Sequence, residues 1–493
     1  MILALSKHSM VRTIVLGILP AVGFVACGEE PGDPSSDDTS SITEALVSGM
    51  TNVTNGQTPN STFQSETAAV AIGGGEAIAY NTDDSAHGQV SDHYCQNYAG
   101  QALTYRVTST GGWQTIRIPT GAGISMLNGD PALAARNDPN NFRVYLSSLA
   151  VSTTQWNTLP KRADGCISLT TRSDVAVVDR ACVTAVDVPR SGAAASVVWL
   201  SCMPAAAGDA FDGGNLFFNS ASGMLYAAYW NFARGTVDVF RRGNAFTKIA
   251  QPFTGKTIKG HPIFVRNSGA PVLIAPDSAG TFWYSSFVES SLSWTAPVQV
   301  ATGFKWQDTV QLRNGKTFRQ IGYAADWMNG GAFTPYLLFM YQKPRSAAGF
   351  TQLQGVICGT APTFSCSPVA SFATPANENA ILPAMAVSHS SNRGGPVITP
   401  YLSYWTDAGS ASGTLALRMA LIDVGTMTLV TKVTTGTQTP CVVENYWGDY
   451  DQMIVQEEGL STAKLIRPGT DSTGAACNAN GDPQHVSMLS VSP

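Results

Sequence analysis

The hydrophobic and polar positions of this chain alternate over short stretches. Residues 128–149 show the pattern most clearly, with an Asp-Pro corner at Asp130, a short apolar strand, a polar turn over residues 137–141 and a second strand from Phe142 to Leu149. Short apolar or alternating runs bounded by Asn, Asp, Gly and Pro are typical of β-strands joined by turns. The stretch therefore predicts a β-hairpin, and the chain lacks the sustained heptads of long helices.

Looser copies of this hairpin recur along the chain. With the first one included, the copies begin at Glu66, Asp130, Asp212, His261, Gln320, Leu382 and Asp449. Repeats of a few short strands in a fixed order are typical of β-propellers, because one four-stranded blade must stack on its neighbours to bury both faces. We predict an all-β fold with a single β-propeller of seven four-stranded blades. Six blades is the alternative count, and unrelated hairpins in a β-sandwich or solenoid are the alternative architecture.

Composition and charge narrow the class of protein. Only 13% of the 493 residues are charged, against about 25% in typical domains, and this low fraction is typical of a secreted β protein. The net charge of −5 provides no basic surface for nucleic acid or for anionic membranes. A membrane contact is expected only through a lipid anchor.

The amino terminus indicates export. Lys7 and Arg12 precede an apolar run from Thr13 to Ala26 that is short for a permanent membrane span. The segment Phe24-Val25-Ala26-Cys27 resembles the lipobox of bacterial lipoproteins, which implies that Cys27 is lipidated; an ordinary cleaved signal is the alternative. We expect a lipoprotein signal peptide over residues 1–26 and an acidic, Ser/Pro-rich disordered linker over residues 27–43. The propeller is expected over residues 44–493. A strand from residues 41–53 is expected to close the ring. The expected location is the outer membrane or cell surface.

Cysteine usage agrees with an oxidising compartment, because eight cysteines remain when Cys27 is set aside. Cys358 and Cys366 flank a short turn and are expected to bridge a hairpin, and Cys441 and Cys477 are expected to tie down the last blade. The pairing among Cys95, Cys166, Cys182 and Cys202 stays open. No C-x-x-C spacing of a zinc or redox site is present.

The openings of the repeats are the candidate functional positions. If each opening begins an innermost strand, then Glu66, Asp130, Asp212, His261 and Asp449 converge on one rim of the central channel. Converging carboxylates push their pKa values apart, as glycosidase acid and base groups require, so Asp130, Asp212 and Glu66 are the candidate catalytic residues. The same oxygens would suit Ca²⁺, while no other cofactor and no metal ligands are assigned. The alternative is that each Asp only caps its own turn.

Further polar and aromatic residues lie near the expected rim and are candidate binding residues together with His261 and Asp449. Aromatic rings there would stack on sugar faces, although packing between blades explains them equally well. The candidates are His93, Asp326, Trp327 and Trp447, with Tyr94, Trp230, Tyr323, Tyr446 and Tyr450 as further aromatics.

The repeat style resembles the sialidase-like, neuraminidase-type β-propellers. The matching residues are Asp130-Pro131-Ala132-Leu133-Ala134 and Trp447-Gly448-Asp449-Tyr450. The resemblance covers the chain after about residue 60 and implies the fold more than an activity. Arg117-Ile118-Pro119 looks like the family's Arg-Ile-Pro motif but is expected on an outer strand. The segment from Asp277 to Trp283 departs from the aspartate box by one extra residue, and the arginines and Tyr/Glu pair of a sialidase cannot be placed.

Two functions remain compatible with the sequence, which does not decide whether the protein is an enzyme. The favoured one is a surface-anchored, monomeric propeller that binds glycan or cell-surface protein partners through one face. The alternative is a sialidase-like glycoside hydrolase, or a polysaccharide lyase, that uses the carboxylates of the central funnel as acid and base. Motifs of serine hydrolases, zinc proteases and phosphate-binding loops are absent from the sequence.

Overall fold

The computed structural model divides the chain into two units, residues 1–41 and 42–493, and every described residue lies in the second unit. The described residues are 51–52, 64–82, 93–94, 98–163, 165–168, 178–266, 269–305, 309–311, 317–319, 322–328, 336–344, 351–359, 364–367, 370–371, 378–392, 395–407, 415–423, 426, 428–438, 452–456, 462–470 and 484–491. The expected signal peptide, Cys27 and the linker lie outside them.

The first three blades are antiparallel sheets whose strands follow chain order. The first blade consists of β2 (Gln64–Ile72), β3 (Gly75–Thr82), β6 (Gln101–Arg106) and β7 (Gln114–Arg117). The second consists of β9 (Leu133–Asn137), β10 (Asn141–Ser152), β12 (Arg180–Pro189) and β13 (Ser196–Cys202). The third consists of β14 (Phe211–Asn219), β15 (Met224–Asn231), β16 (Thr236–Arg242) and β17 (Phe246–Lys248).

The next three blades continue the same order, and two of them have a divided outer strand. The fourth consists of β18 (Ile263–Phe264), β19 (Val272–Pro276) and β20 (Thr281–Val288), with β21 (Ser293–Trp294) and β22 (Val298–Thr302) outside β20. The fifth consists of β25 (Tyr323–Met328), β26 (Tyr336–Pro344) and β27 (Thr351–Gly359), with β28 (Ser365–Cys366) and β29 (Ala370–Ser371) outside β27. The sixth consists of β30 (Ala380–Asn392), β31 (Gly395–Thr406), β32 (Leu415–Asp423) and β33 (Thr428–Gln438).

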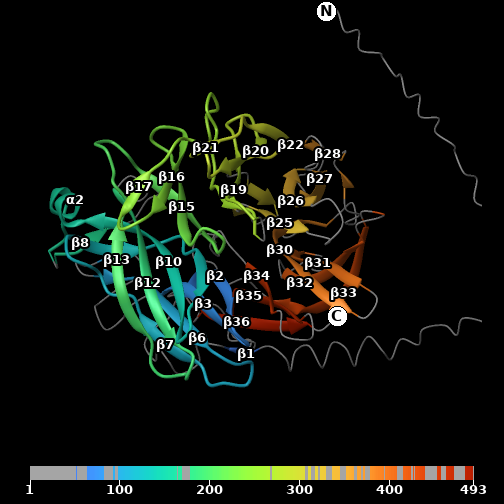
Figure 1. Cartoon of the computed structure of the whole chain (residues 1–493), viewed down its shortest axis with the longest axis horizontal. Helices are drawn as coiled ribbons and strands as arrows, with labels where there is room; N and C mark the ends of the chain where they lie inside the picture. Colours follow the sequence, from blue (N-terminus) through green and yellow to red (C-terminus); the bar gives the residue numbers. More distant parts are fainter. Residues whose placement is uncertain are drawn as a thin grey trace, which may run out of the picture. The chain divides into compact units, whose positions relative to one another are not determined.

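A further four-stranded sheet, the closing sheet, contains strands from both ends of the described chain. Its order is β34 (Gln452–Gln456), β35 (Thr462–Thr470), β36 (Gln484–Val491) and β1 (Thr51–Asn52). The strand β34 contacts β30 on one side and β2 on the other, and the remaining innermost strands contact one another in the order β2, β9, β14, β18, β25 and β30 (Figure 1). The prediction of an all-β propeller of four-stranded blades is confirmed. Six blades follow in chain order, which agrees with the alternative count of six and does not support the count of seven. The closing sheet, with a strand from the predicted residues 41–53, completes the ring.

Smaller elements lie outside this pattern. The helix α2 (Thr153–Thr158) follows β10, and β5 (Tyr98–Ala99) runs parallel to β8 (Ile124–Asn128), which extends the sheet of the second blade. Two short pairs are formed by β4 (His93–Tyr94) with β11 (Ile167–Ser168) and by β23 (Thr309–Gln311) with β24 (Thr317–Arg319). The part of the chain that the structure describes contains no apolar helix of the length needed to cross a bilayer.

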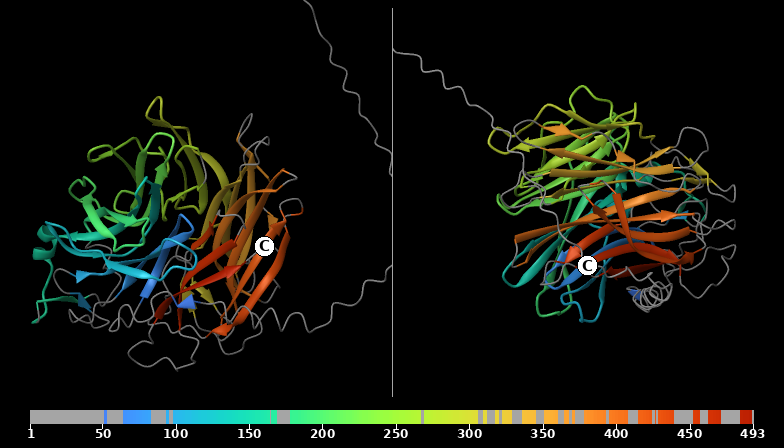
Figure 2. Two further views of the ribbon diagram at one scale, coloured as in Figure 1. Left: turned by 60° about the horizontal axis from the view of Figure 1, so that its bottom comes forward. Right: turned by 90° about the vertical axis from the view of Figure 1, so that its right-hand side faces the viewer.

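Apolar clusters between neighbouring blades form the core. Between the second and third blades, Phe211, Tyr229 and Phe240 are fully buried and pack edge to face. Burying one such side chain contributes roughly 1.5–3 kcal/mol, and similar clusters join the following blades. Figure 2 shows the strands of neighbouring blades crossing at an angle, as twisted sheets do when they pack face to face.

Disulfides connect the outer strands of two blades. Cys358 and Cys366 join β27 to β28, so that pairing is confirmed. Cys182 and Cys202 join the corresponding strands of the second blade, β12 and β13, near the opposite end, which decides a pairing that the sequence left open. Cys166 is also disulfide-bonded, and the expected Cys441–Cys477 pair lies outside the described residues.

Candidate functional site

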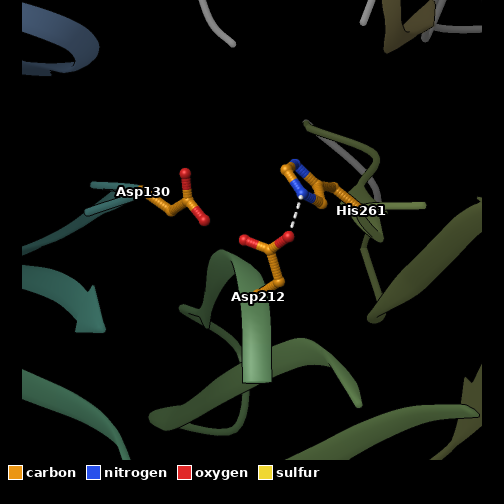
Figure 3. A group of neighbouring side chains, drawn as sticks. All are labelled: Asp130, Asp212 and His261. Carbon is orange, nitrogen blue, oxygen red and sulfur yellow. Dashed lines mark ion pairs between the residues drawn. The ribbon is translucent and has the colours of Figure 1, made fainter. Parts of the chain in front are cut away.

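Three of the predicted ring residues come together in the structure. The ligand atoms of Asp130, Asp212 and His261 all lie within 4.8 Å of one another, and Figure 3 shows the two carboxylates and the imidazole pointing toward a common centre. Asp130 precedes β9, Asp212 lies in β14 and His261 precedes β18. The cluster therefore joins the innermost strands of three consecutive blades.

Asp130 has an unusual backbone conformation. Its φ of 42° lies in the left-handed region, which is rare for residues other than glycine, and Pro131 follows directly. The Oδ2 atom accepts a hydrogen bond from the Gly213 amide at 2.8 Å, and the Ser147 hydroxyl donates to the Asp130 carbonyl at 3.2 Å. The residue is 5% exposed. Its carboxylate thus serves as a buried acceptor that connects the second blade to the third.

Asp212 is positioned by a bulge in β14. Asp212 pairs with Trp230 and Asn215 with Ala228, so Gly213 and Gly214 together face a single residue of β15. A Cβ atom on Gly213, which has a φ of 54°, would lie 2.1 Å from the Cγ atom of His261. Only a residue without a side chain allows the imidazole to approach the strand this closely.

His261 is held from several sides. Its ring lies 6.1 Å, centroid to centroid, from the ring of Trp230, and the hydroxyl of Tyr323 donates a hydrogen bond to its carbonyl. Its Nε2 atom lies 3.3 Å from Oδ2 of Asp212, and its side chain is 2% exposed. Residues of the third and fifth blades thereby fix this histidine of the fourth blade.

The electrostatics of the cluster favour an ionised Asp212. Burial alone raises the pKa of Asp212, but the charge of His261 and hydrogen bonds from His261, Asp130 and the Gly213 amide outweigh burial, so the pKa is lowered from 3.8 to about 2. The side chain of Asp212 is 19% exposed, so it is the most accessible member of the cluster.

This geometry restricts the chemistry of the cluster. Glycosidases separate their two carboxyl groups by roughly 5–5.5 Å or 6.5–9.5 Å, because a substrate atom or a water lies between them, whereas the ligand oxygens of Asp130 and Asp212 lie within 4.8 Å of each other. Two carboxylates and an imidazole also form a ligand set that Zn²⁺ or Mn²⁺ accepts. Ca²⁺ takes six to eight oxygen ligands, which is more than this cluster supplies.

The other predicted site residues lie elsewhere or outside the described part. Asp326 is buried in β25, where its carboxylate accepts hydrogen bonds from the Trp327 amide at 2.7 Å and the Val387 amide at 2.9 Å. It therefore caps backbone amides and is not part of the cluster, and Trp327 packs against the core between the fourth and fifth blades.

The remaining predicted site residues have side chains that lie outside the described part, or they lie on outer strands and turns. Glu66 lies at a bulge in β2, between Ser65 and Thr67, and His93 lies in β4; their side chains are outside the described part. Asp449 and Trp447 precede β34 and also lie outside it. Arg117 ends β7, the outermost strand of its blade, as expected. In the segment that departs from the aspartate box, the carboxylate of Asp277 accepts hydrogen bonds from the Ala279 and Thr281 amides, in the turn before β20.

The sequence analysis missed the glycines and the serine that support the cluster. Gly213 and Gly214 allow the approach of His261 and of Ser147, whose Oγ atom would lie 2.5 Å from a Cβ on Gly214. Two consecutive glycines inside a strand pattern are a signal for a bulge. Ser147 gives no such signal, because its role depends on the neighbouring blade.

Comparisons with known proteins give only distant likenesses. No family model and no curated protein matches the chain. A leech intramolecular trans-sialidase complexed with 2,7-anhydro-Neu5Ac is 9% identical over 71% of this chain and 66% of its own, with a TM-score of 0.43. The Aleuria aurantia lectin in complex with Fucα1-6GlcNAc is 12% identical over 77% and 98%, with a TM-score of 0.40. A polysaccharide lyase of the PL25 family, an ulvan lyase, is 9% identical over 86% and 91%, with a TM-score of 0.44.

Proposed function

We propose that this protein is a glycan-binding propeller in which Asp212 is the residue that faces the ligand. One observation supports this proposal above the others: in the cluster, Asp212 keeps 19% of its side chain exposed, while the side chain of His261 is 2% exposed and Asp130 is 5% exposed. An ionised carboxylate held in one position is a good acceptor for the paired hydroxyl groups of a sugar, because hydrogen bonds to a charged acceptor are stronger than those between neutral groups. Asp130 and His261 position the carboxylate of Asp212.

The arrangement argues against the use of Asp130 and Asp212 as a glycosidase pair. Asp130 is 5% exposed, and its carboxylate accepts the Gly213 amide, so this carboxylate serves the backbone of the next blade. A general acid and a base must each reach the substrate. Binding therefore accounts for the geometry better than hydrolysis does.

A glycan array tests the proposal. We expect the soluble domain to bind at least one glycan class, and we expect Asp212→Asn, which removes the charge with little change in shape, to weaken binding at least tenfold. Asp423→Asn is the matched control, because Asp423 is an exposed aspartate at the end of β32. Equal binding by the wild type and Asp212→Asn would contradict the proposal. If the soluble domain retains cell-surface proteins and binds no glycan, the partner is a protein.

A glycoside hydrolase or polysaccharide lyase is the second candidate. The left-handed backbone of Asp130 favours it, since strained residues other than glycine cluster at active sites. An activity screen of the soluble domain against polysaccharides and sialosides tests this candidate. Product release that disappears in Asp130→Asn, with the protein still folded, would establish it in place of simple binding.

The cellular location is a further part of the proposal. The apolar run before Cys27 supports export and a lipid anchor, and the disulfides are typical of an oxidising compartment. Labelling of cells with a radioactive fatty acid should mark the wild type and leave Cys27→Ser unlabelled. Fractionation of the same cells should find the wild type with the outer membrane. Labelling of both proteins would refute Cys27 as the anchored residue.

A further inference from the structure

A cluster of arginines lies at the other end of the strands that carry the Asp130–Asp212–His261 cluster. Arg136 is near the end of β9, whereas Asp130 precedes its start, and Arg136 pairs directly with Arg143 of β10. Like charges opposite each other across a sheet are destabilising. Asp138 balances Arg136 with a contact of 2.7 Å, and Asp187 accepts two hydrogen bonds of 2.8 Å from Arg143.

Arg242 of the third blade adds another positive charge to this place. Its guanidinium lies 3.5 Å from the centre of the Trp199 ring and 5.6 Å from that of Phe246. Within the described residues, the side chain of Arg242 takes part in no ion pair and no hydrogen bond. Stacking covers one face of the guanidinium and leaves the N–H groups at its edge available, because these donors point outward in the plane of the group.

The neighbouring groups supply more donors than acceptors. The Nε atom of Arg136 is buried and donates to no acceptor in the described part of the chain. Tyr145, which is 5% exposed, lies close enough to feel the charges of Arg136, Arg143 and Arg242. Burial raises the pKa of Tyr145, so its hydroxyl stays protonated at neutral pH.

The charges near Arg242 do not cancel. Burial lowers the pKa of Arg242, and the charge of Arg143 lowers it further. The two carboxylates at this place are already engaged by Arg136 and Arg143, so one positive charge is left. An anion in front of Arg242 would remove this excess charge and satisfy the donors together.

We propose that Arg242, stacked on Trp199 and flanked by Arg143 and Tyr145, forms a second binding site that takes an oxyanion, the carboxylate or sulfate group of an acidic ligand. Guanidinium groups bind such planar or tetrahedral oxyanions through paired hydrogen bonds. The site lies between the second and third blades, and it does not depend on Asp212 or on the glycan binding proposed for that residue.

Isothermal titration of the soluble domain with sodium glucuronate and with sodium sulfate tests the site, and glucose serves as the neutral counterpart. We expect glucuronate, sulfate or both to bind, and glucose to give no signal at this site. Arg242→Gln should weaken the binding at least tenfold, and Arg242→Lys should have an intermediate effect because it keeps the charge but loses the paired donors. Lys256→Gln is the matched control, since Lys256 also stacks on a tryptophan, at 3.4 Å from the ring of Trp283.

The outcomes separate the sources of the oxyanion. Binding of glucuronate alone would assign a carboxylate, and binding of sulfate alone would assign a sulfate ester. Binding of neither by the folded wild type, or equal binding by the wild type and both Arg242 variants, would overturn the proposal. If Arg242→Gln does not fold, the intermediate affinity of Arg242→Lys provides the test. Asp212→Asn should leave this binding unchanged, so a failure here is distinct from a failure of the Asp212 proposal.

Discussion

The carboxylate of Asp130 accepts the backbone amide of Gly213 at 2.8 Å and so connects two consecutive blades. The same relation recurs where Asn215 accepts the Phe264 amide at 3.2 Å and where Asp326 accepts the Val387 amide at 2.9 Å. Each acceptor lies on or just before one innermost strand, and each donor lies on the next. Buried amides need partners, and within the described residues the innermost strands of different blades share no ladder, apart from one isolated bridge between Arg266 and Asp326. These side chains therefore replace the missing ladder.

Replacement of Asp130 should destabilise the propeller. Asp130→Ala removes one of the two acceptors of the Gly213 amide, which also donates to Oδ1 of Asp212 at 3.0 Å. We therefore expect a loss of about 1 kcal/mol of unfolding free energy, near the lower end for a lost buried acceptor. Asp130→Asn keeps an acceptor oxygen and should cost less. Denaturant unfolding of the soluble domain measures both. The control is Asp423→Ala, because Asp423 is exposed and its carboxylate accepts hydrogen bonds from Thr426 in its own turn instead of from another blade. A loss in Asp130→Ala no larger than in that control would show that the connection between blades contributes nothing.

A methyl group on Gly213 should disrupt the cluster. In Gly213→Ala the new Cβ atom would lie 2.1 Å from His261, and the φ of 54° disfavours a side chain as well. We expect a loss of about 3 kcal/mol or more. Gly223→Ala is the control, because Gly223 has a φ of 68° with open space around it, and its cost should be about 1 kcal/mol. Thermal unfolding compares the two, and equal losses would mean that the contact with His261 is unimportant.

The contribution of Asp212 should depend on pH. Its pKa is lowered from 3.8 to about 2 in the folded protein, so its ionisation stabilises the fold above about pH 4 and the benefit disappears as the pH falls through 2. The full effect is about 2 kcal/mol. Unfolding free energies of the wild type and Asp212→Asn should therefore differ at pH 6 and converge near pH 2. A difference that stays constant over this range would contradict the lowered pKa.

The Cys182–Cys202 and Cys358–Cys366 disulfides should contribute unequally to the free energy of unfolding. Cys182 and Cys202 are 20 residues apart in sequence, whereas Cys358 and Cys366 are 8 apart. The chain-entropy relation gives about 3.3 kcal/mol for the longer loop and about 2.5 kcal/mol for the shorter one. Double replacement by alanine in each pair, followed by denaturant unfolding, measures the difference. A larger loss from Cys358→Ala with Cys366→Ala would show that local packing, and not loop length, decides the effect.

The sequence predicts the start of the innermost strands well, because the signal is local. Each predicted opening lies within or shortly before one of these strands, as Asp130 does for β9 and His261 for β18. The convergence of Asp130, Asp212 and His261 follows from the symmetry of a propeller, in which equivalent positions meet at the channel. The sequence predicts Asp326 as a polar residue on a rim loop, but it lies in β25 and its carboxylate accepts an amide of the next blade.

Other features depend on contacts between blades, which local patterns do not contain. The two-residue bulge at Gly213 and Gly214 is defined only by its pairing with β15. The residue with a left-handed backbone is Asp130 in the second blade and Gly213 in the third. Asp212 therefore lies one residue before the position that corresponds to Asp130. The stacking of Arg242 on Trp199 joins residues of different blades. Neither relation has a spacing that a single sequence reveals.

The closing sheet also determines the order in which the protein can fold during synthesis. Thr51 pairs with Met488, so a strand that is synthesised early waits for one that is synthesised much later. Blades built from consecutive hairpins can form while the chain is still emerging, because their contacts are close in sequence. Until β36 arrives, the ring has an open edge that other chains could pair with. A nascent or truncated chain is therefore the form that most needs chaperones.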